Sequence, residues 1–421
     1  MALVLVTLAL TWRRSLVTGF AANKSVSPVP DGAARAITRG AGEGSRDVGE
    51  PKNGKADGAP QPRPLQRCFA TDASGSPARP LDALLDRAAD LFEKTDFALS
   101  LACAEEAARV EPSSVEAHHE RADALRELKR IAEAQDAFAR ALALDPDDPR
   151  TLDGAADFYV NRLPATADHL ETGLEYARRG TRKVKRSHDK SLVSHLALLE
   201  GEALSDLGRP REAVGRLEAA LSLDPDNVHV LYERAVAEFE LCRFDEARRD
   251  LQGVIARDPK DAGAHHQLGL LLERAGDAEG AERELVKAQS LSPEDFKSPV
   301  LPSVAEFKAM VAAEVAKLPE ALRHDLGQVS LETADVPELL DLTAEEPPLS
   351  PTILGLYRGA PLGDPAADPK EGRTIVIYRK NLARAVASRD ELVTQIRTTL
   401  LHELGHVRGE DDEDLRARGL E

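Results

Sequence analysis

Residues 225–259 read PDNVHVLYERAVAEFELCRFDEARRDLQGVIARDP, a unit whose pattern recurs through much of the chain. Its two prolines lie 34 positions apart, and small residues stand 24 and 12 positions before the second proline, at Ala235 and Ala247. Proline cannot continue a helix, so it is expected where a helix ends. The spacing predicts two short helices that pack closely where only small side chains fit, with Pro259 ending the second.

The same unit extends in both directions from this segment. Pro112 and Pro146 are also 34 positions apart, as are Pro259 and Pro293. Small residues occupy the same two positions before each of the five prolines: Ala88, Ala122, Gly201, Ala235 and Gly269, then Ser100, Ala134, Ala213, Ala247 and Ala281. The 79 positions from Pro146 to Pro225 accommodate one irregular repeat with 11 extra residues and small positions at Ala156, Gly173 and Gly180. About six helix pairs are therefore predicted, which is enough for a stable solenoid.

The period and the small positions resemble the tetratricopeptide repeat (TPR) over residues 81–295. This resemblance implies an α-solenoid whose concave face holds a protein or a peptide. No residue of the sequence identifies that partner.

The overall composition excludes several classes of protein. The 421 residues carry a net charge of −18, which argues against a general nucleic-acid binder because Lys and Arg make the phosphate contacts. No apolar run reaches the ~18 residues that a membrane-spanning helix needs. Cys68, Cys103 and Cys242 are odd in number and far apart, so they suit neither a disulfide framework nor a cysteine metal site. A reducing compartment, and hence the cytoplasm, is the expectation.

The N-terminal segment has a different composition. Residues 1–80 are rich in Gly and Pro and are predicted to form a disordered arm. The apolar start, MALVLVTLALTW, is followed rather than preceded by basic residues, unlike a secretory signal. Three interpretations of residues 1–22 stay open: an unstructured or wrongly assigned start, an export signal that would place the protein in the periplasm, and a transit peptide.

The residues that carry chemistry lie near the C-terminus. Residues 402–406 read HELGH, at the end of a helix predicted over 389–407 that begins with the capping box of Ser388 and Glu391. Imidazoles four residues apart lie one turn apart on one helix face, so His402 and His406 can bind one Zn²⁺. Glu403 lies beside that face and can accept a proton from water activated by the metal.

The motif continues as HELGHVRGEDD, or HExxHxxGxxD. Gly409 can adopt a positive φ, which would let the chain turn sharply so that residue 412 reaches the metal. Every residue from Glu410 to Asp414 is acidic and is a candidate for the third ligand, and the spacing favours Asp412. The pattern resembles the long zinc motif of the metzincins, with Asp412 where those enzymes have a third His. Their methionine turn is missing, since Met310 precedes the motif.

Residues 303–421 as a whole look like the small bacterial "minimal zincin" metallopeptidases. The resemblance is carried by PTILGLYRGAPL (351–362), RTIVIYRKNL (373–382) and DELVTQIRTTLLHELGHVRGEDDEDLRARGL (390–420). It implies a compact α+β unit in which His402, His406 and Asp412 bind Zn²⁺ and Glu403 is the general base.

Other elements of this segment follow from local signals. A helix is predicted over 303–318, and short strands over 329–331, 353–357 and 374–378. Peptide hydrolysis also needs a group that stabilises an oxyanion. The side chains available for this are Tyr357, Tyr378, Arg379 and His324, and each of them is expected to be a packing or surface residue instead.

Together these observations predict a mostly α protein with an N-terminal arm, a TPR-like α-solenoid over 81–295, a linker over 296–302 and a small α+β zincin-like domain over 303–421. The predicted function is that of a zinc-dependent peptidase whose repeats recruit a protein substrate. The alternative is a protein-binding TPR scaffold whose C-terminal domain holds a metal without hydrolysing anything.

Overall fold

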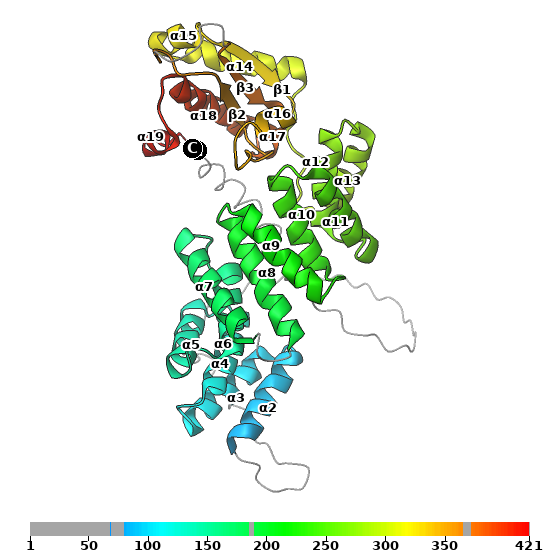
Figure 1. The fold of residues 1–421 in the computed structure, drawn as a ribbon, viewed down its shortest axis with the longest axis vertical. Helices are drawn as coiled ribbons and strands as arrows, with labels where there is room; N and C mark the ends of the chain where they lie inside the picture. Colours follow the sequence, from blue (N-terminus) through cyan, green and yellow to red (C-terminus); the bar gives the residue numbers. More distant parts are fainter. Residues whose placement is uncertain (1–67, 69–79, 185–188, 365–371, 421) are drawn as a thin grey trace, which may run out of the picture.

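The computed structural model describes residue 68 and residues 80–184, 189–364 and 372–420. The predicted arm and the segment 1–22 lie outside the described residues, apart from Cys68 and Pro80. The chain is mostly helical, as predicted: a TPR-like solenoid, called the array below, is followed by a small α+β C-terminal domain at one end of it (Figure 1). In the part of the chain that is described, no helix is long and apolar enough to cross a membrane.

The array consists, in the described residues, of six consecutive helix pairs. The first helix of five of these pairs begins at a residue whose side chain accepts a hydrogen bond from the backbone N–H three residues on: Ser114, Asp148, Asp189, Asn227 and Asp261. The pairs are α2 (Pro80–Glu93) with α3 (Phe97–Val110), α4 (Val115–Glu127) with α5 (Ile131–Leu144), α6 (Pro149–Asp157) with α7 (Ala167–Val184), α8 (Lys190–Asp206) with α9 (Pro210–Leu223), α10 (Val228–Glu240) with α11 (Phe244–Arg257), and α12 (Ala262–Arg274) with α13 (Ala278–Leu291).

The small residues stand where two helices approach most closely. A Cβ atom at Gly201 would lie 2.6 Å from Leu217 Cγ, and one at Gly269 would lie 2.7 Å from Leu285 Cγ. The third pair contains the predicted extra residues: α6 continues into the π-helical turn η1 (Phe158–Arg162), and α7 is 18 residues long. Gly173 lets α7 pack against that turn, since a Cβ there would lie 2.6 Å from Val160 Cγ2.

The C-terminal domain is built around a three-stranded sheet of order β1-β3-β2, in which β1 is parallel and β2 antiparallel to β3. The long helix α18 packs against the sheet through Ile396 and Leu400, which share a buried core with Ile375 and Ile377 of β3. The elements are α14 (Val304–Lys317), α15 (Glu320–Leu326), β1 (Ser330–Ala334), α16 (Leu339–Leu342), β2 (Gly355–Arg358), β3 (Thr374–Tyr378), α17 (Arg379–Arg384), α18 (Arg389–Val407) and α19 (Asp412–Ala417).

The sequence predicted the elements with strong local signals. The helix predicted over 303–318 is present as α14 and begins with a capping box of Ser303 and Glu306, and β3 and α18 have the predicted bounds. The other two strands lie one to a few residues further along than predicted, at Ser330–Ala334 and Gly355–Arg358. The short helices α15, α16, α17 and α19 were not predicted, because four to seven residues give too little periodicity.

The C-terminal domain contacts the last repeats directly. The Glu273 carboxylate of α12 lies 2.8 Å from Lys380 Nζ and 2.8 Å from an Arg384 guanidinium nitrogen of α17. Arg274, the next residue, donates to the Pro337 carbonyl oxygen at 2.9 Å. Cys242, in the loop between α10 and α11, and Phe244, the first residue of α11, pack against the apolar cluster that contains Tyr378 of β3. The orientation of the C-terminal domain is therefore fixed by packing and charge at this interface.

We expect Glu273→Ala to destabilise this interface by about 1.5–3 kcal/mol, the range for hydrogen bonds to charged groups, because Lys380 and Arg384 both lose their half-buried partner. The change should lower the thermal midpoint and speed proteolysis between residues 296 and 302. Glu279→Ala, an exposed acid on α13, is the matched control. If both variants have the same thermal midpoint and the same rate of proteolysis, Glu273 does not stabilise this interface.

One expectation from the cysteines is wrong. Cys68 and Cys103 are joined by a disulfide, although their separation of 35 residues gave no sign of it. The chain at residue 68 lies against the buried side chain of Cys103 on α3, a long-range contact that spacing does not encode. Disulfides persist in oxidising compartments, so this pair weighs against the expected reducing one. Cys242 is the free cysteine of the described residues.

Candidate metal centre

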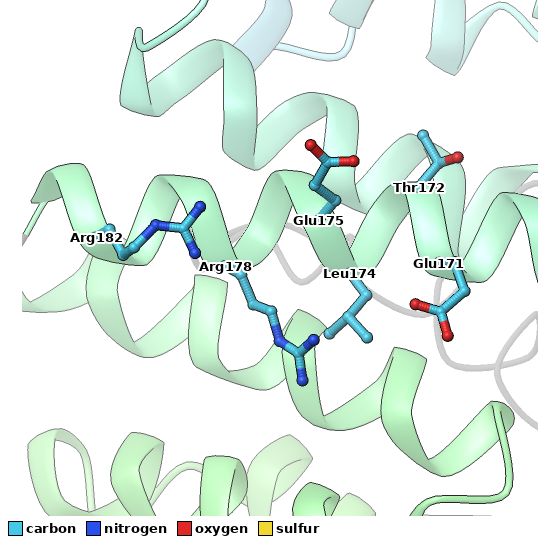
Figure 2. A pocket seen from close by; sticks show the side chains of 6 residues that line it. All are labelled: Glu171, Thr172, Leu174, Glu175, Arg178 and Arg182. Carbon is cyan, nitrogen blue, oxygen red and sulfur yellow. The ribbon is translucent and has the colours of Figure 1, made fainter.

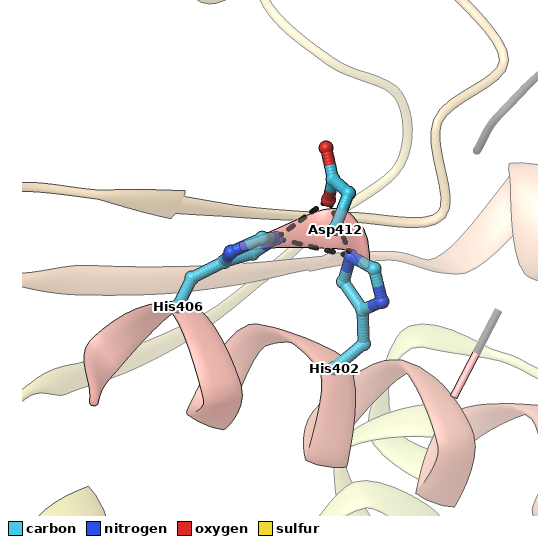
Figure 3. A group of neighbouring side chains, drawn as sticks. All are labelled: His402, His406 and Asp412. Atoms are coloured by element: carbon cyan, nitrogen blue, oxygen red, sulfur yellow. Dashed lines mark hydrogen bonds and ion pairs between the residues drawn. The ribbon is translucent and has the colours of Figure 1, made fainter. Parts of the chain in front are cut away.

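Two turns of α18 and the start of α19 bring three side chains together. His402 and His406 lie on one face of α18, and Asp412 is the first residue of α19 (Figure 3). The two Nε2 atoms are 3.0 Å apart, and Asp412 Oδ1 lies 3.6 Å from His402 Nε2 and 3.3 Å from His406 Nε2. The sequence predicted these three residues as ligands, and the structure places their donor atoms around one point.

Two glycines make this geometry accessible. Gly409 has a φ of +84°, a conformation in which glycine avoids the strain of other residues, and it reverses the chain after α18. Gly405 lets α19 pack directly on α18, because a Cβ at this position would lie 2.2 Å from Leu415 Cδ2. The HExxHxxG pattern therefore supplies the turn and the close approach that bring Asp412 to the histidines.

The structure distinguishes Asp412 from its acidic neighbours. Asp411 caps α19 by accepting a hydrogen bond from the Asp414 N–H at 2.9 Å. Glu410 forms an ion pair with Arg418. Glu413 and Asp414 are exposed. Within the acidic segment, Asp412 is thus the residue whose carboxylate faces the histidines.

The hydrogen bonds of the two imidazoles define which nitrogen carries the proton. His402 Nδ1 lies 2.6 Å from the Leu420 carbonyl oxygen, and His406 Nδ1 lies 3.0 Å from the Glu410 carbonyl oxygen. A carbonyl only accepts, so both Nδ1 atoms are the protonated ones in the neutral rings. Both Nε2 atoms then present lone pairs to each other and to Asp412. Burial lowers the pKa of His402, which also favours the neutral ring.

This donor set fits a zinc ion. A tetrahedral Zn²⁺ with bonds of 2.0–2.1 Å separates its donor atoms by about 3.3–3.4 Å, and the three observed distances are 3.0, 3.3 and 3.6 Å. Three lone-pair donors at this spacing repel one another unless a cation lies between them. Hydrogen bonds from Nδ1 to backbone carbonyls are the outer contacts that metal-binding histidines usually make.

Glu403 lies behind this centre, between α18 and the sheet. Its side chain is 5% exposed, and the backbone N–H of Tyr357 on β2 donates to its carboxylate. Burial raises the pKa of Glu403 to about 8. Gly355 makes room for it, since a Cβ there would lie 2.8 Å from Glu403 Oε1. Sequence reasoning missed Gly355 and the Tyr357 N–H, although a glycine at the start of a strand opposite a functional helix can signal close approach.

The side chains considered as oxyanion donors have other contacts. The Tyr357 hydroxyl donates to the Ala360 carbonyl oxygen at 2.6 Å. Arg379 donates to the Asp335 carboxylate at 2.8 Å and to the Pro302 carbonyl oxygen at 2.6 Å. Tyr378 is buried, and His324 is exposed on α15. The expectation that these are packing or surface residues agrees with their surroundings.

A cavity of about 290 Å³ on the array lies along α7, far from this centre in the chain. Figure 2 shows its lining on successive turns of α7: Glu171, Thr172, Leu174, Glu175, Arg178 and Arg182. Arg178 lies 3.5 Å from the Glu212 carboxylate of α9, and Arg209 lies 3.5 Å from that of Glu171. Two of the lining charges, Glu171 and Arg178, are thus engaged in ion pairs between neighbouring helices.

We expect removal of residues 420 and 421 to weaken Zn²⁺ binding by roughly 10–100-fold, the usual cost of losing an outer partner of a metal ligand. Without the Leu420 carbonyl, the His402 ring loses the contact that orients its Nε2 atom. Removal of residue 421 alone leaves an acceptor oxygen on Leu420, now part of a carboxylate, and is the control. Competition with a fluorescent chelator measures both affinities, and equal values would show that Leu420 plays no such role.

Comparisons with known proteins separate the array from the C-terminal domain, as the structure does. Residues 326–420 match the family described as zincin-like metallopeptidase, and residues 85–149 and 204–268 match families described as tetratricopeptide repeat. The chain thus has segments similar to tetratricopeptide repeats followed by a segment similar to zincin-like metallopeptidases. The boundaries at 81, 296 and 303 are not tested by these matches and stay predictions.

Two curated relatives are named for tetratricopeptide repeats. A TPR repeat-containing protein of Pseudomonas aeruginosa is 30% identical over 199 residues, which cover 47% of this chain and 32% of the relative. A tetratricopeptide repeat and J domain-containing co-chaperone of Fusarium oxysporum is 29% identical over 36% of this chain and 29% of its own length. The chain therefore spans about a third of the curated relatives it matches.

Two solved structures are similar to this chain at low sequence identity. The type IV pilus biogenesis factor PilW is 18% identical with a TM-score of 0.47, over 52% of this chain and 98% of that protein. The PilF protein of Pseudomonas aeruginosa is 17% identical with a TM-score of 0.45, over 55% of this chain and 97% of that protein.

Proposed function

We propose that the protein is a zinc-dependent peptidase whose TPR array recruits a protein substrate. The observation that carries this proposal is the convergence of three lone-pair donors, from His402, His406 and Asp412, beside the buried carboxylate of Glu403. A structural zinc site needs no such carboxylate next to it, whereas hydrolysis needs a proton acceptor there. The match of residues 326–420 to zincin-like metallopeptidases supports the same conclusion.

His402, His406 and Asp412 would hold the Zn²⁺, which when bound supplies a Lewis acid that polarises a carbonyl and acidifies water. Glu403 would accept a proton from the attacking water and return it to the departing amine. The Tyr357 N–H holds the Glu403 carboxylate in one orientation while it does so. Because Asp412 brings a negative charge, the bound ion would be a weaker Lewis acid than one held by three imidazoles.

The array would bind a protein or a peptide on its concave face, as the TPR match and the co-chaperone among the curated relatives suggest. The interface at Glu273 would keep that face and the metal centre at a constant separation. For the location of the protein, the cytoplasm predicted from the sequence competes with export, and the Cys68–Cys103 disulfide supports export.

A second candidate function is that of a TPR scaffold whose C-terminal domain binds a metal without hydrolysis. The contacts of Tyr357 and Arg379 favour it, since these side chains are occupied rather than directed at the metal centre. This candidate predicts a bound metal and a stable partner that is never cleaved.

One experiment separates the two functions. The zinc-loaded Glu403→Gln protein is used to capture partners from a lysate, and each captured protein is then incubated with wild-type protein or with the variant. Peptidase function predicts new fragments, identified by mass spectrometry, with wild type alone. If captured partners stay intact with wild type, the scaffold function is the correct one.

A further inference from the structure

A second group of metal-binding side chains lies inside the array. It consists of Glu202 on α8 with His229 and Glu233 on α10, the first helices of neighbouring pairs. His229 Nε2 lies 3.2 Å from Glu202 Oε1, and one donor atom of each residue lies within 4.8 Å of the others. His229 and Glu233 are four residues apart, so they share one face of α10, as His402 and His406 share one face of α18.

The carboxylates of this group are shielded from water. Glu202 is 5% exposed and Glu233 is 1% exposed. Two carboxylates side by side in a site without bulk water repel each other unless positive charge lies close to them. The His195 imidazole, which lies 2.7 Å from Asp153, also acts on Glu202 and supplies part of that charge.

Glu202 is held in place by a neutral partner. The Asn161 amide donates to Glu202 Oε2 at 3.0 Å and to Asp157 Oδ1 at 3.0 Å. Asn161 belongs to the π-helical turn η1, a type of turn that is common at functional sites. Its hydrogen bond fixes Oε2, so that Oε1 faces His229. Carboxylates that bind a metal are commonly held by such an outer hydrogen bond, which leaves the other oxygen free to face the ion.

We propose that Glu202, His229 and Glu233 form a second metal site, which binds a divalent transition-metal ion and joins α8 to α10 within the array. One imidazole and two carboxylates suit Zn²⁺, whereas Ca²⁺ and Mg²⁺ prefer oxygen ligands alone. A change of rotamer at Glu233 would bring the donors from their present spacing, within 4.8 Å of one another, to the about 3.3 Å that a tetrahedral zinc ion needs. The three residues leave a coordination position for water or for a group of a bound partner.

The test uses the full-length protein with the C-terminal centre removed by His406→Ala and Asp412→Ala. This background makes the outcome independent of the proposed peptidase function. We expect calorimetric titration with Zn²⁺ to show about one equivalent bound. Adding Glu202→Gln or Glu233→Gln should weaken this binding by about 100-fold or more, beyond the loss caused by an outer partner.

Glu200→Gln is the matched control. Glu200 lies on the same helix and is 1% exposed, but its carboxylate accepts a hydrogen bond from Thr181 and faces Arg216 instead. Glutamine keeps the shape of glutamate, and circular dichroism in chelator verifies that each variant is folded. A background protein that binds no Zn²⁺ would overturn the proposal. Unchanged affinity in Glu202→Gln would overturn it as well.

Discussion

The Glu403→Gln protein should keep its zinc and lose cleavage of its substrate by about 10²–10⁴-fold, the usual contribution of a general base. Glutamine has nearly the same shape and can still receive the hydrogen bond from the Tyr357 N–H. It has no carboxylate to accept a proton. Since Glu403 is not among the three converging donors, the bound metal should remain at one equivalent for this centre.

This prediction is checked by measuring kcat/KM and metal content on the same preparation. Glu413→Gln is the control, since it removes an exposed acid from α19 without touching the centre. The control should match wild type in both measurements. Equal turnover by Glu403→Gln and wild type would mean that the cleaving activity belongs to another site or to a contaminant. Loss of metal in Glu403→Gln would instead mean that Glu403 is a ligand.

Local signals allowed much of the fold to be predicted. The bounds of α18 follow from Ser388, which accepts a hydrogen bond from the Glu391 N–H at its start, and from Gly409 beyond its end. The array was predictable because each repeat needs small side chains at the same crossings, as Gly201 and Gly269 show. Short helices such as α17 lack such signals, and tertiary contacts determine them.

The candidate centre was predictable only in part. The spacing of His402, His406 and Asp412 predicted that their side chains lie close together, and the structure shows this. Their role as metal ligands stays a prediction. The carbonyl oxygen of Leu420 and the N–H of Tyr357 are backbone groups, so no residue type reveals them. The group in the array was missed for a related reason. His229 and Glu233 have a helical spacing, but Glu202 joins them only through the packing of two repeats.

Replacement of either histidine should have the largest effect on metal binding. We expect His402→Ala and His406→Ala each to weaken Zn²⁺ binding at the C-terminal centre by more than 100-fold, beyond the roughly 10–100-fold that the loss of an outer partner costs. Each change removes one of three donors and leaves an imidazole and a carboxylate, which is one donor fewer than a catalytic zinc site provides.

The Asp412→Asn variant refines this expectation. Asparagine keeps an oxygen near the two Nε2 atoms but removes the negative charge, so its loss of affinity should be smaller than that of the histidine variants. His324→Ala, an exposed histidine on α15, should bind as wild type does. Chelator competition in a background with Glu202→Gln and Glu233→Gln isolates this centre from the array. Retention of tight binding by His406→Ala would show that the ion is held elsewhere, and the peptidase function would fall with it.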